Sequence, residues 1–202
     1  MNKNPANFVP LTPISFLHRT ADVYGQNTSV IYENRIYTWS ESRERCVRIA
    51  SSLNSHGVMS GDTVSILAFN TPEMFESHFS IPMAGAVLNS INVRLDARTI
   101  AHILNDSNAK MLLVDRELFE VASDAISISS SNPKVVLIND AFAESKPNVT
   151  ENTIEYESLV ENGDPSFKWQ KPDDEWQPLS LNYTSGTTGQ PKGVVYHHRG
   201  SY

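Results

Sequence analysis

Cysteine, long apolar runs and excess positive charge are all scarce in this sequence. Its 202 residues include a single cysteine, Cys46. One thiol cannot form an internal disulfide and is no metal site by itself, which fits a reducing compartment. No stretch approaches the ~20 apolar residues that a membrane-spanning helix needs, so we expect no transmembrane segment. The amino-terminal stretch MNKNPANFVPLTPISF also lacks the apolar centre of a secretory signal.

The charge balance argues against a further class, the nucleic-acid-binding proteins. The formal net charge is −7, and no basic stripe is present that could displace counterions from phosphates. We therefore expect no nucleic-acid partner. Hydrophobic residues make up 40% of the chain and charged residues 19%, which is the composition of a folded protein.

Helical and extended patterns alternate along the chain. Thr38 and Glu41 have the spacing of a capping box, which predicts a helix from Trp39 that stops at Gly57, with Cys46 on its buried stripe. The apolar runs that predict interior strands are TVSILAF, GAVLNSI, KMLLVD and KVVLI (63–69, 85–91, 110–115 and 134–138). Short strands separated by helices predict an α/β fold, with a mainly parallel sheet flanked by helices on both faces.

The pattern is weaker between residues 139 and 178. One short strand and one helix are expected around TIEYESLVENG (153–163). We interpret the rest as a surface connection, and Asp173, Asp174 and Glu175 as a solvated acidic turn. Three consecutive side chains rarely point at one centre, so this turn is not expected to bind a metal.

Glycine and hydroxyl side chains gather in one segment, YTSGTTGQPKG (183–193). The residues before and after it, LNY and GVVYHH, are typical of strands. A Walker A loop needs glycine at its first and sixth positions, followed by lysine and then serine or threonine. Counted from Gly186, the sixth position is Pro191, and Gly193 follows Lys192. The segment is therefore not a P-loop of the GTPase or kinase kind.

The segment still has the ingredients of a phosphate cradle. Glycines allow backbone N–H groups to turn toward an anion, hydroxyls add donors, and a lysine adds a positive charge. The alternative is a plain polar hairpin turn, which the Pro-Lys-Gly sequence at this spacing disfavours. The residues that we expect to contact phosphates are Thr184, Ser185, Gly186, Thr187, Thr188, Gly189 and Lys192.

The same segment closely resembles the signature loop of the adenylate-forming acyl-CoA synthetase and ligase family, also called the AMP-binding superfamily. Residues 61–92 and 94–115 resemble two upstream blocks of that family. Residues 10–32, with YTWSE at 37–41, resemble the entry region of plant acyl-activating enzymes of the medium-chain type. The resemblance covers nearly the whole chain and is least secure from Asn139 to Pro178.

The resemblance implies an ATP-dependent acid–CoA ligase. Such enzymes join a carboxylic acid to AMP with Mg²⁺-ATP, release pyrophosphate, and then transfer the acyl group to coenzyme A. The loop would hold the β- and γ-phosphates of ATP. It offers no general base, and none is needed, because a carboxylate is already a nucleophile at neutral pH. The substrate would be a fatty or small aromatic acid, and the location peroxisomal or cytoplasmic.

The resemblance also implies that residues 1–202 are the incomplete first part of a large N-terminal domain, with the C-terminal domain absent. We then expect little or no activity from this chain alone. We also expect an uncovered sheet edge that favours self-association. The alternative is a truncated, non-catalytic product that binds nucleotide or pairs with a full-length relative.

The histidines are assigned less directly. His198 matches a histidine that follows the loop in the family, and it either packs the next turn or touches the acyl or nucleotide site. The other candidates, His18, His56, His78 and His102, lie on predicted helices or at their ends, and we interpret them as bystanders.

Overall fold

A computed structural model describes residues 2–4, 6–147, 149, 152–169, 171–184 and 189–202 of the chain. Its helices are α1 (Ile14–Tyr24), α2 (Trp39–Ser55), α3 (Pro72–Met83), α4 (Ala97–Asp106), a 3₁₀ turn η1 (Arg116–Leu118), α5 (Phe119–Ile128), α6 (Tyr156–Asn162) and α7 (His198–Ser201). Its strands are β1 (Thr28–Tyr32), β2 (Arg35–Thr38), β3 (Thr63–Leu67), β4 (Val87–Ser90), β5 (Met111–Asp115), β6 (Lys134–Ile138), β7 (Ile154–Glu155), β8 (Pro178–Thr184) and β9 (Lys192–His197).

Seven of the described strands form one sheet, in the order β7-β6-β5-β3-β4-β8-β9. All neighbours in it are parallel except β8 and β9, which pair antiparallel at one edge. The strands β1 and β2 form a separate hairpin. The predicted α/β fold with a mainly parallel sheet is confirmed.

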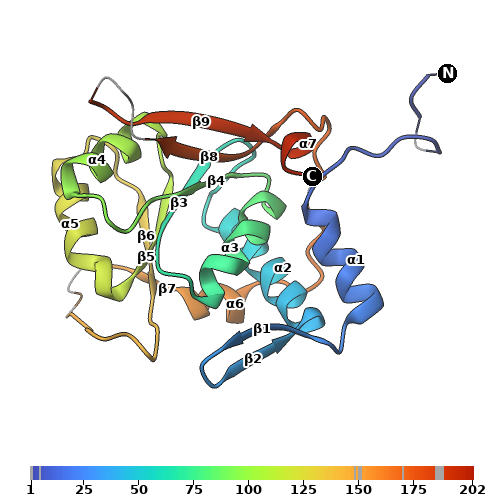
Figure 1. Ribbon diagram of the computed structural model, residues 1–202, viewed down its shortest axis with the longest axis horizontal. Helices are drawn as coiled ribbons and strands as arrows, with labels where there is room; N and C mark the ends of the chain where they lie inside the picture. The colour runs from blue at the N-terminus through green and yellow to red at the C-terminus, as the bar shows by residue number, and fades with distance from the viewer. Residues whose placement is uncertain (1, 5, 148, 150–151, 170, 185–188) are drawn as a thin grey trace.

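Helices cover both faces of the sheet, as Figure 1 shows, with α4 and α5 on one side and α2 and α3 on the other. Alternate residues of β5 point to opposite faces because side chains alternate along a strand. Met111 and Leu113 join the cluster under α1, α2, α3 and α6, whereas Leu112 and Val114 join the cluster under α4 and α5. Each strand in the middle of the sheet is therefore buried on both sides, which explains its nearly continuous apolar sequence.

Helix α2 forms where the capping pattern predicts it. The Thr38 hydroxyl accepts a hydrogen bond from the Glu41 N–H, and the Glu41 carboxylate accepts one from the Thr38 N–H. The predicted burial of Cys46 is confirmed, and Ile49, Ala50 and Leu53 on the same stripe of the helix are fully buried with it. Burial raises the pKa of the Cys46 thiol well above its ordinary value.

A buried ionic network ties α3 to α2 and α6. The Glu76 carboxylate is 1% exposed and binds the Arg45 guanidinium through two hydrogen bonds, of 2.5 and 3.2 Å. The Tyr156 hydroxyl donates to the same carboxylate at 2.9 Å. Arg45 also binds Glu157, which is largely exposed. Burial raises the pKa of Glu76, although Arg45 and Tyr156 both favour its charged form.

A second buried carboxylate, Asp115, lies at the end of β5. It accepts a hydrogen bond from the Glu117 N–H at 3.0 Å and so caps the 3₁₀ turn. Burial, and then the negative charges of Glu117, Asp140 and Glu73, raise the pKa of Asp115 from 3.8 to about 6. Because the folded state then binds the proton more tightly than the unfolded state, this group stabilises the fold at low pH and loses that contribution as the pH rises.

Replacement of Asp115 by asparagine tests this linkage, because the amide oxygen can still accept from the Glu117 N–H. Between about pH 4.5 and about pH 7, we expect the free energy of unfolding of the Asp115→Asn variant to rise relative to wild type by on the order of 2 kcal/mol. Urea unfolding across this pH range gives the difference. Asp124→Asn, at an exposed position of α5, is the control. A pH-independent difference between Asp115→Asn and wild type would contradict the raised pKa.

No helix within the described ranges has the length and apolar run that a bilayer crossing requires.

Candidate functional site

The glycine- and hydroxyl-rich segment connects β8 to β9, as the flanking sequence predicts. The two strands pair in register up to the loop, with Tyr183 opposite Gly193 and Thr184 opposite Lys192. Because β8 runs parallel to β4, the loop leaves the sheet at the carboxyl edge of its parallel strands. Ligands of open α/β sheets bind at this edge.

Three of the seven predicted phosphate contacts lie in the described part of the chain: Thr184, Gly189 and Lys192. The other four, Ser185, Gly186, Thr187 and Thr188, lie outside the described residues. Thr184 and Lys192 are exposed cross-strand partners, so they stand side by side at the base of the loop. Gly189 has a φ of 92°, in the left-handed region that a residue with a Cβ adopts only with strain.

The Lys192 ammonium is uncommitted within the described part of the chain, where it takes part in no ion pair. The ion pairs of the described residues are all made by arginines, namely Arg35, Arg43, Arg45, Arg48 and Arg199, so Lys192 shares this freedom with the other described lysines and differs from them in its place beside the loop. An exposed cation beside a hydroxyl-rich segment is suited to bind an anion when, as here, no carboxylate among the described residues neutralises its charge.

Gly193 has a packing role rather than a conformational one. A Cβ at this position would lie 2.9 Å from the Leu181 Cδ1 and 3.3 Å from the Tyr183 Cζ. The missing side chain therefore leaves room for the Tyr183 ring to lie across β9. The glycine that follows the lysine thus allows close packing at the base of the loop.

Two side chains of α4 contact the base of the loop, and sequence reasoning missed both. The Tyr183 hydroxyl donates to the Asp106 Oδ2 at 2.7 Å, and the His102 Nε2 is 3.3 Å from the Pro191 carbonyl oxygen. His102, interpreted from the sequence as a bystander, is therefore in contact with the base of the loop. The available signal was the spacing of four residues between His102 and Asp106, which puts both on one face of a helix.

His198 lies at the other end of β9 from the loop and is buried. Its Nδ1 is 2.9 Å from the Thr12 hydroxyl oxygen, and burial, then His197, lower its pKa. Of the two roles left open for this residue, these contacts support the packing role, with Thr12 of the amino-terminal segment as the partner.

The acidic turn differs from its prediction at one residue. Asp173 and Asp174 are exposed as expected, but Glu175 is buried. Its carboxylate accepts a hydrogen bond from the Leu11 N–H at 3.0 Å and binds the Arg199 guanidinium. These contacts lower the pKa of Glu175, the Leu11 N–H first and Arg199 second. Glu175 therefore links the amino-terminal segment, through Leu11, to α7, through Arg199.

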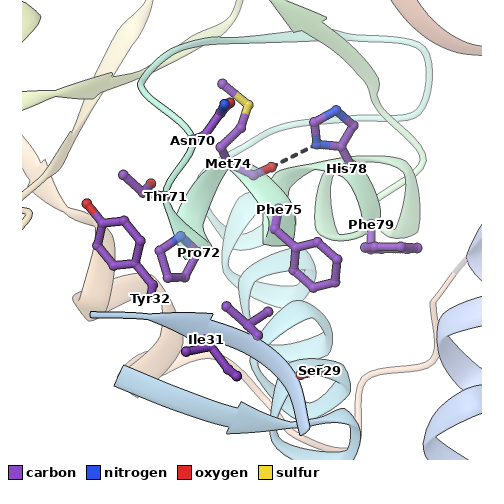
Figure 2. A pocket seen from close by; sticks show the side chains of 11 residues that line it. Ser29, Ile31, Tyr32, Asn70, Thr71, Pro72, Met74, Phe75, His78 and Phe79 are labelled. Carbon is purple, nitrogen blue, oxygen red and sulfur yellow. Dashed lines mark hydrogen bonds between the residues drawn. The ribbon is translucent and has the colours of Figure 1, made fainter. Parts of the chain in front are cut away.

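A separate apolar pocket of about 650 Å³ lies between the β1–β2 hairpin and α3. Figure 2 shows Tyr32 of the hairpin beside Thr71 and Pro72 at the start of α3, with Phe75 and Phe79 further along the helix. None of the described residues predicted to contact phosphate lines this pocket.

A family model described as "AMP-binding enzyme" matches residues 17–202. The chain therefore belongs to the AMP-binding enzyme family.

Curated relatives agree with this assignment. The chain is 46% identical to an acetate–CoA ligase of Humulus lupulus, over 99% of this chain and 37% of that one. It is 46% identical to a peroxisomal trans-cinnamate:CoA ligase of Petunia hybrida, over 98% and 37% of the two chains. A peroxisomal acetate/butyrate–CoA ligase of Arabidopsis thaliana is 45% identical, over 99% and 37%. The chain thus spans little more than a third of the length of these relatives.

Solved structures show the same fold. An anthranilate CoA ligase in complex with anthranoyl-AMP superposes with a TM-score of 0.84 at 22% identity, over 98% of this chain and 37% of that one. A benzoate CoA ligase from Burkholderia xenovorans gives a TM-score of 0.78 at 20% identity, over 93% and 35%.

Proposed function

We propose that this chain supplies the triphosphate-binding part of an ATP-dependent acid–CoA ligase. In this proposal residues 1–202 are part of the N-terminal AMP-binding domain, and the C-terminal domain lies outside them. The observation that carries the proposal is the pairing of exposed Lys192 with exposed Thr184 across β8 and β9, at the base of a loop within the segment that matches the AMP-binding family.

The proposed reaction has two steps, each with its own leaving group. The carboxylate oxygen of the acid attacks the α-phosphorus of ATP, and pyrophosphate leaves. The thiolate sulfur of coenzyme A then attacks the acyl carbonyl, and AMP leaves. Lys192 and the loop hydroxyls, Thr184 among them, would hold the β- and γ-phosphates in line and offset the charge of the departing pyrophosphate.

Magnesium would arrive with the nucleotide in this scheme. The described residues bring together no group of three or more histidine, cysteine, aspartate or glutamate side chains that could hold a metal ion. Mg²⁺ commonly binds through substrate phosphates and a small number of carboxylates, which agrees with delivery as Mg²⁺-ATP.

The proposed acid is a short-chain fatty acid or a small aromatic acid. The printed names of the relatives include acetate, butyrate and trans-cinnamate, which span this range. Some of these names also include the word peroxisomal, so a peroxisomal or cytoplasmic location stays our prediction.

Lys192→Ala tests the proposal directly. In the 202-residue chain we expect it to weaken ATP binding by about tenfold, because one charge-assisted contact to phosphate is lost. In a chain extended to the length of the relatives, we expect thioester formation to fall by about 100-fold. Calorimetric titration and a coenzyme A thioester assay measure the two effects.

Lys168→Ala is the matched control, since it removes the same charge from an exposed position outside the loop. Its affinity for ATP should equal that of wild type. If Lys192→Ala and Lys168→Ala behaved alike in both assays, the loop would not be the phosphate site.

A further inference from the structure

One face of α4 contacts the base of the loop through two side chains. His102 and Asp106 are four residues apart and share this face. Figure 1 shows α4 beside the end of the β8–β9 hairpin that carries the loop. The opposite face of α4 is independent of this contact, because Ile100, Ile103 and Leu104 are buried against the core.

Asp106 fixes the strand that enters the loop. Its carboxylate accepts the Tyr183 hydroxyl at 2.7 Å, one residue before Thr184. Burial, then the hydrogen bond to Asp106, raise the pKa of Tyr183, so the phenol stays a neutral donor at physiological pH. The Tyr183 ring also packs against the core cluster under α4 and α5. Tyr183 is thus held in place by the hydrogen bond of its hydroxyl and by the packing of its ring.

His102 fixes the strand that leaves the loop. Its Nε2 lies 3.3 Å from the Pro191 carbonyl oxygen. A carbonyl only accepts hydrogen bonds, so the contact requires a proton on Nε2. Pro191 has a fixed φ and precedes Lys192 directly. Holding its carbonyl therefore sets the orientation of the peptide that connects Pro191 to Lys192, and with it the origin of the lysine side chain.

We propose that His102 and Asp106 are positioning residues for the triphosphate contacts, because they hold Lys192 and Thr184 in the geometry that binds phosphate. This inference rests on the proposed function and adds to it a second layer of residues that touch no substrate. Preorganised donors cost little reorganisation when the ligand binds, and a loosely held lysine loses that advantage.

The test compares His102→Leu with His102→Gln in the 202-residue chain. A glutamine Nε2 can take the place of the imidazole Nε2 as donor to the Pro191 carbonyl, whereas leucine keeps volume without a donor. The probe is inorganic tripolyphosphate, followed through the amide shifts of Gly189, Lys192 and Gly193 by NMR. We expect His102→Leu to bind about three- to tenfold more weakly than wild type, and His102→Gln to bind within about twofold of it.

Tyr183→Phe removes the hydrogen bond to Asp106 on the other strand and should weaken binding to a similar extent. His78→Leu is the matched control, since the His78 Nδ1 contacts only a carbonyl of its own helix, Met74, at 2.8 Å among the described residues. Its affinity should match that of wild type. The urea midpoints of all four variants establish that they are folded under the titration conditions.

The outcomes separate this inference from the function on which it rests. Equal affinity of wild type and His102→Leu would overturn the positioning role and leave the phosphate site standing. Failure of His102→Gln to recover binding would also overturn it, because a hydrogen bond would then not be the cause. No binding by wild type would overturn the proposed function, and the positioning role with it.

Discussion

Glu76→Ala is expected to lower the free energy of unfolding by about 2–4 kcal/mol, because it leaves the buried Tyr156 hydroxyl without its acceptor and the half-buried Arg45 guanidinium with Glu157 as its remaining carboxylate partner. The Glu76 carboxylate receives two hydrogen bonds from Arg45 and one from Tyr156. The Tyr156 side chain is buried about as deeply as that of Glu76, at 2% and 1% exposed, so bulk solvent does not reach the hydroxyl in the folded protein.

The same guanidinium provides the control. Arg45 also binds Glu157, whose side chain is 54% exposed. Exposed ion pairs contribute little, so Glu157→Ala should cost about 1 kcal/mol or less. Urea unfolding of both variants at neutral pH measures the contrast. Similar costs for the two variants would show that burial does not govern the strength of this network.

Gly163→Ala is expected to destabilise the fold by about 3 kcal/mol through steric overlap with α2. Gly163 follows α6 and is buried. A Cβ there would lie 2.1 Å from the Arg48 carbonyl oxygen and 2.5 Å from the Arg48 carbonyl carbon. Both atoms belong to the backbone of a helix, so the contact cannot be relieved by a side-chain rotation.

Two companion variants isolate the cause in the same unfolding assay. Arg48→Met removes the hydrogen bond that Arg48 donates to the Gly163 carbonyl, and it adds no atom at the contact. Glu161→Ala changes an exposed position of α6. Both should cost clearly less than Gly163→Ala. Wild-type stability of Gly163→Ala would mean that α2 and α6 separate without cost.

Sequence patterns predicted the elements of this fold well, because local signals and burial agree in it. The capping box at Thr38 and Glu41, and the apolar stripe through Cys46, both act within one helix. Pro82 has no N–H to donate within a helix, and α3 ends one residue later, at Met83. The weak pattern around residues 153–163 also gave the expected short strand and helix, β7 and α6.

Contacts between residues far apart in the sequence were not predicted. Glu175 is surrounded by polar residues, and nothing local indicates that Leu11, 164 positions away, donates to its carboxylate. His102 lies 89 positions from Pro191. A helical pattern shows which face of α4 is polar, but it does not show which strand that face meets, since this depends on the order of strands in the sheet.

The candidate site was predictable in kind from its composition and its flanking strands. Thr184 and Lys192 became neighbours through the register of β8 and β9, which a hairpin assignment implies. The phosphate contacts at all seven residues, including Ser185, Gly186, Thr187 and Thr188, stay a prediction. Self-association through the sheet edge also stays a prediction. The exposed side chains of Val194, Val195 and Tyr196 on the edge strand β9 are consistent with it.

The burial of Cys46 makes the reaction rate of its thiol a measure of how often the fold opens around it. The thiol is fully enclosed, and its Sγ lies 3.6 Å from the Glu76 carbonyl oxygen, next to the ionic network. A thiol reagent added to the native protein can therefore react only after α2 and α3 separate. The rate of thiol modification would therefore report the rate of that separation without any introduced label. A substitution at Glu76 should increase this modification rate.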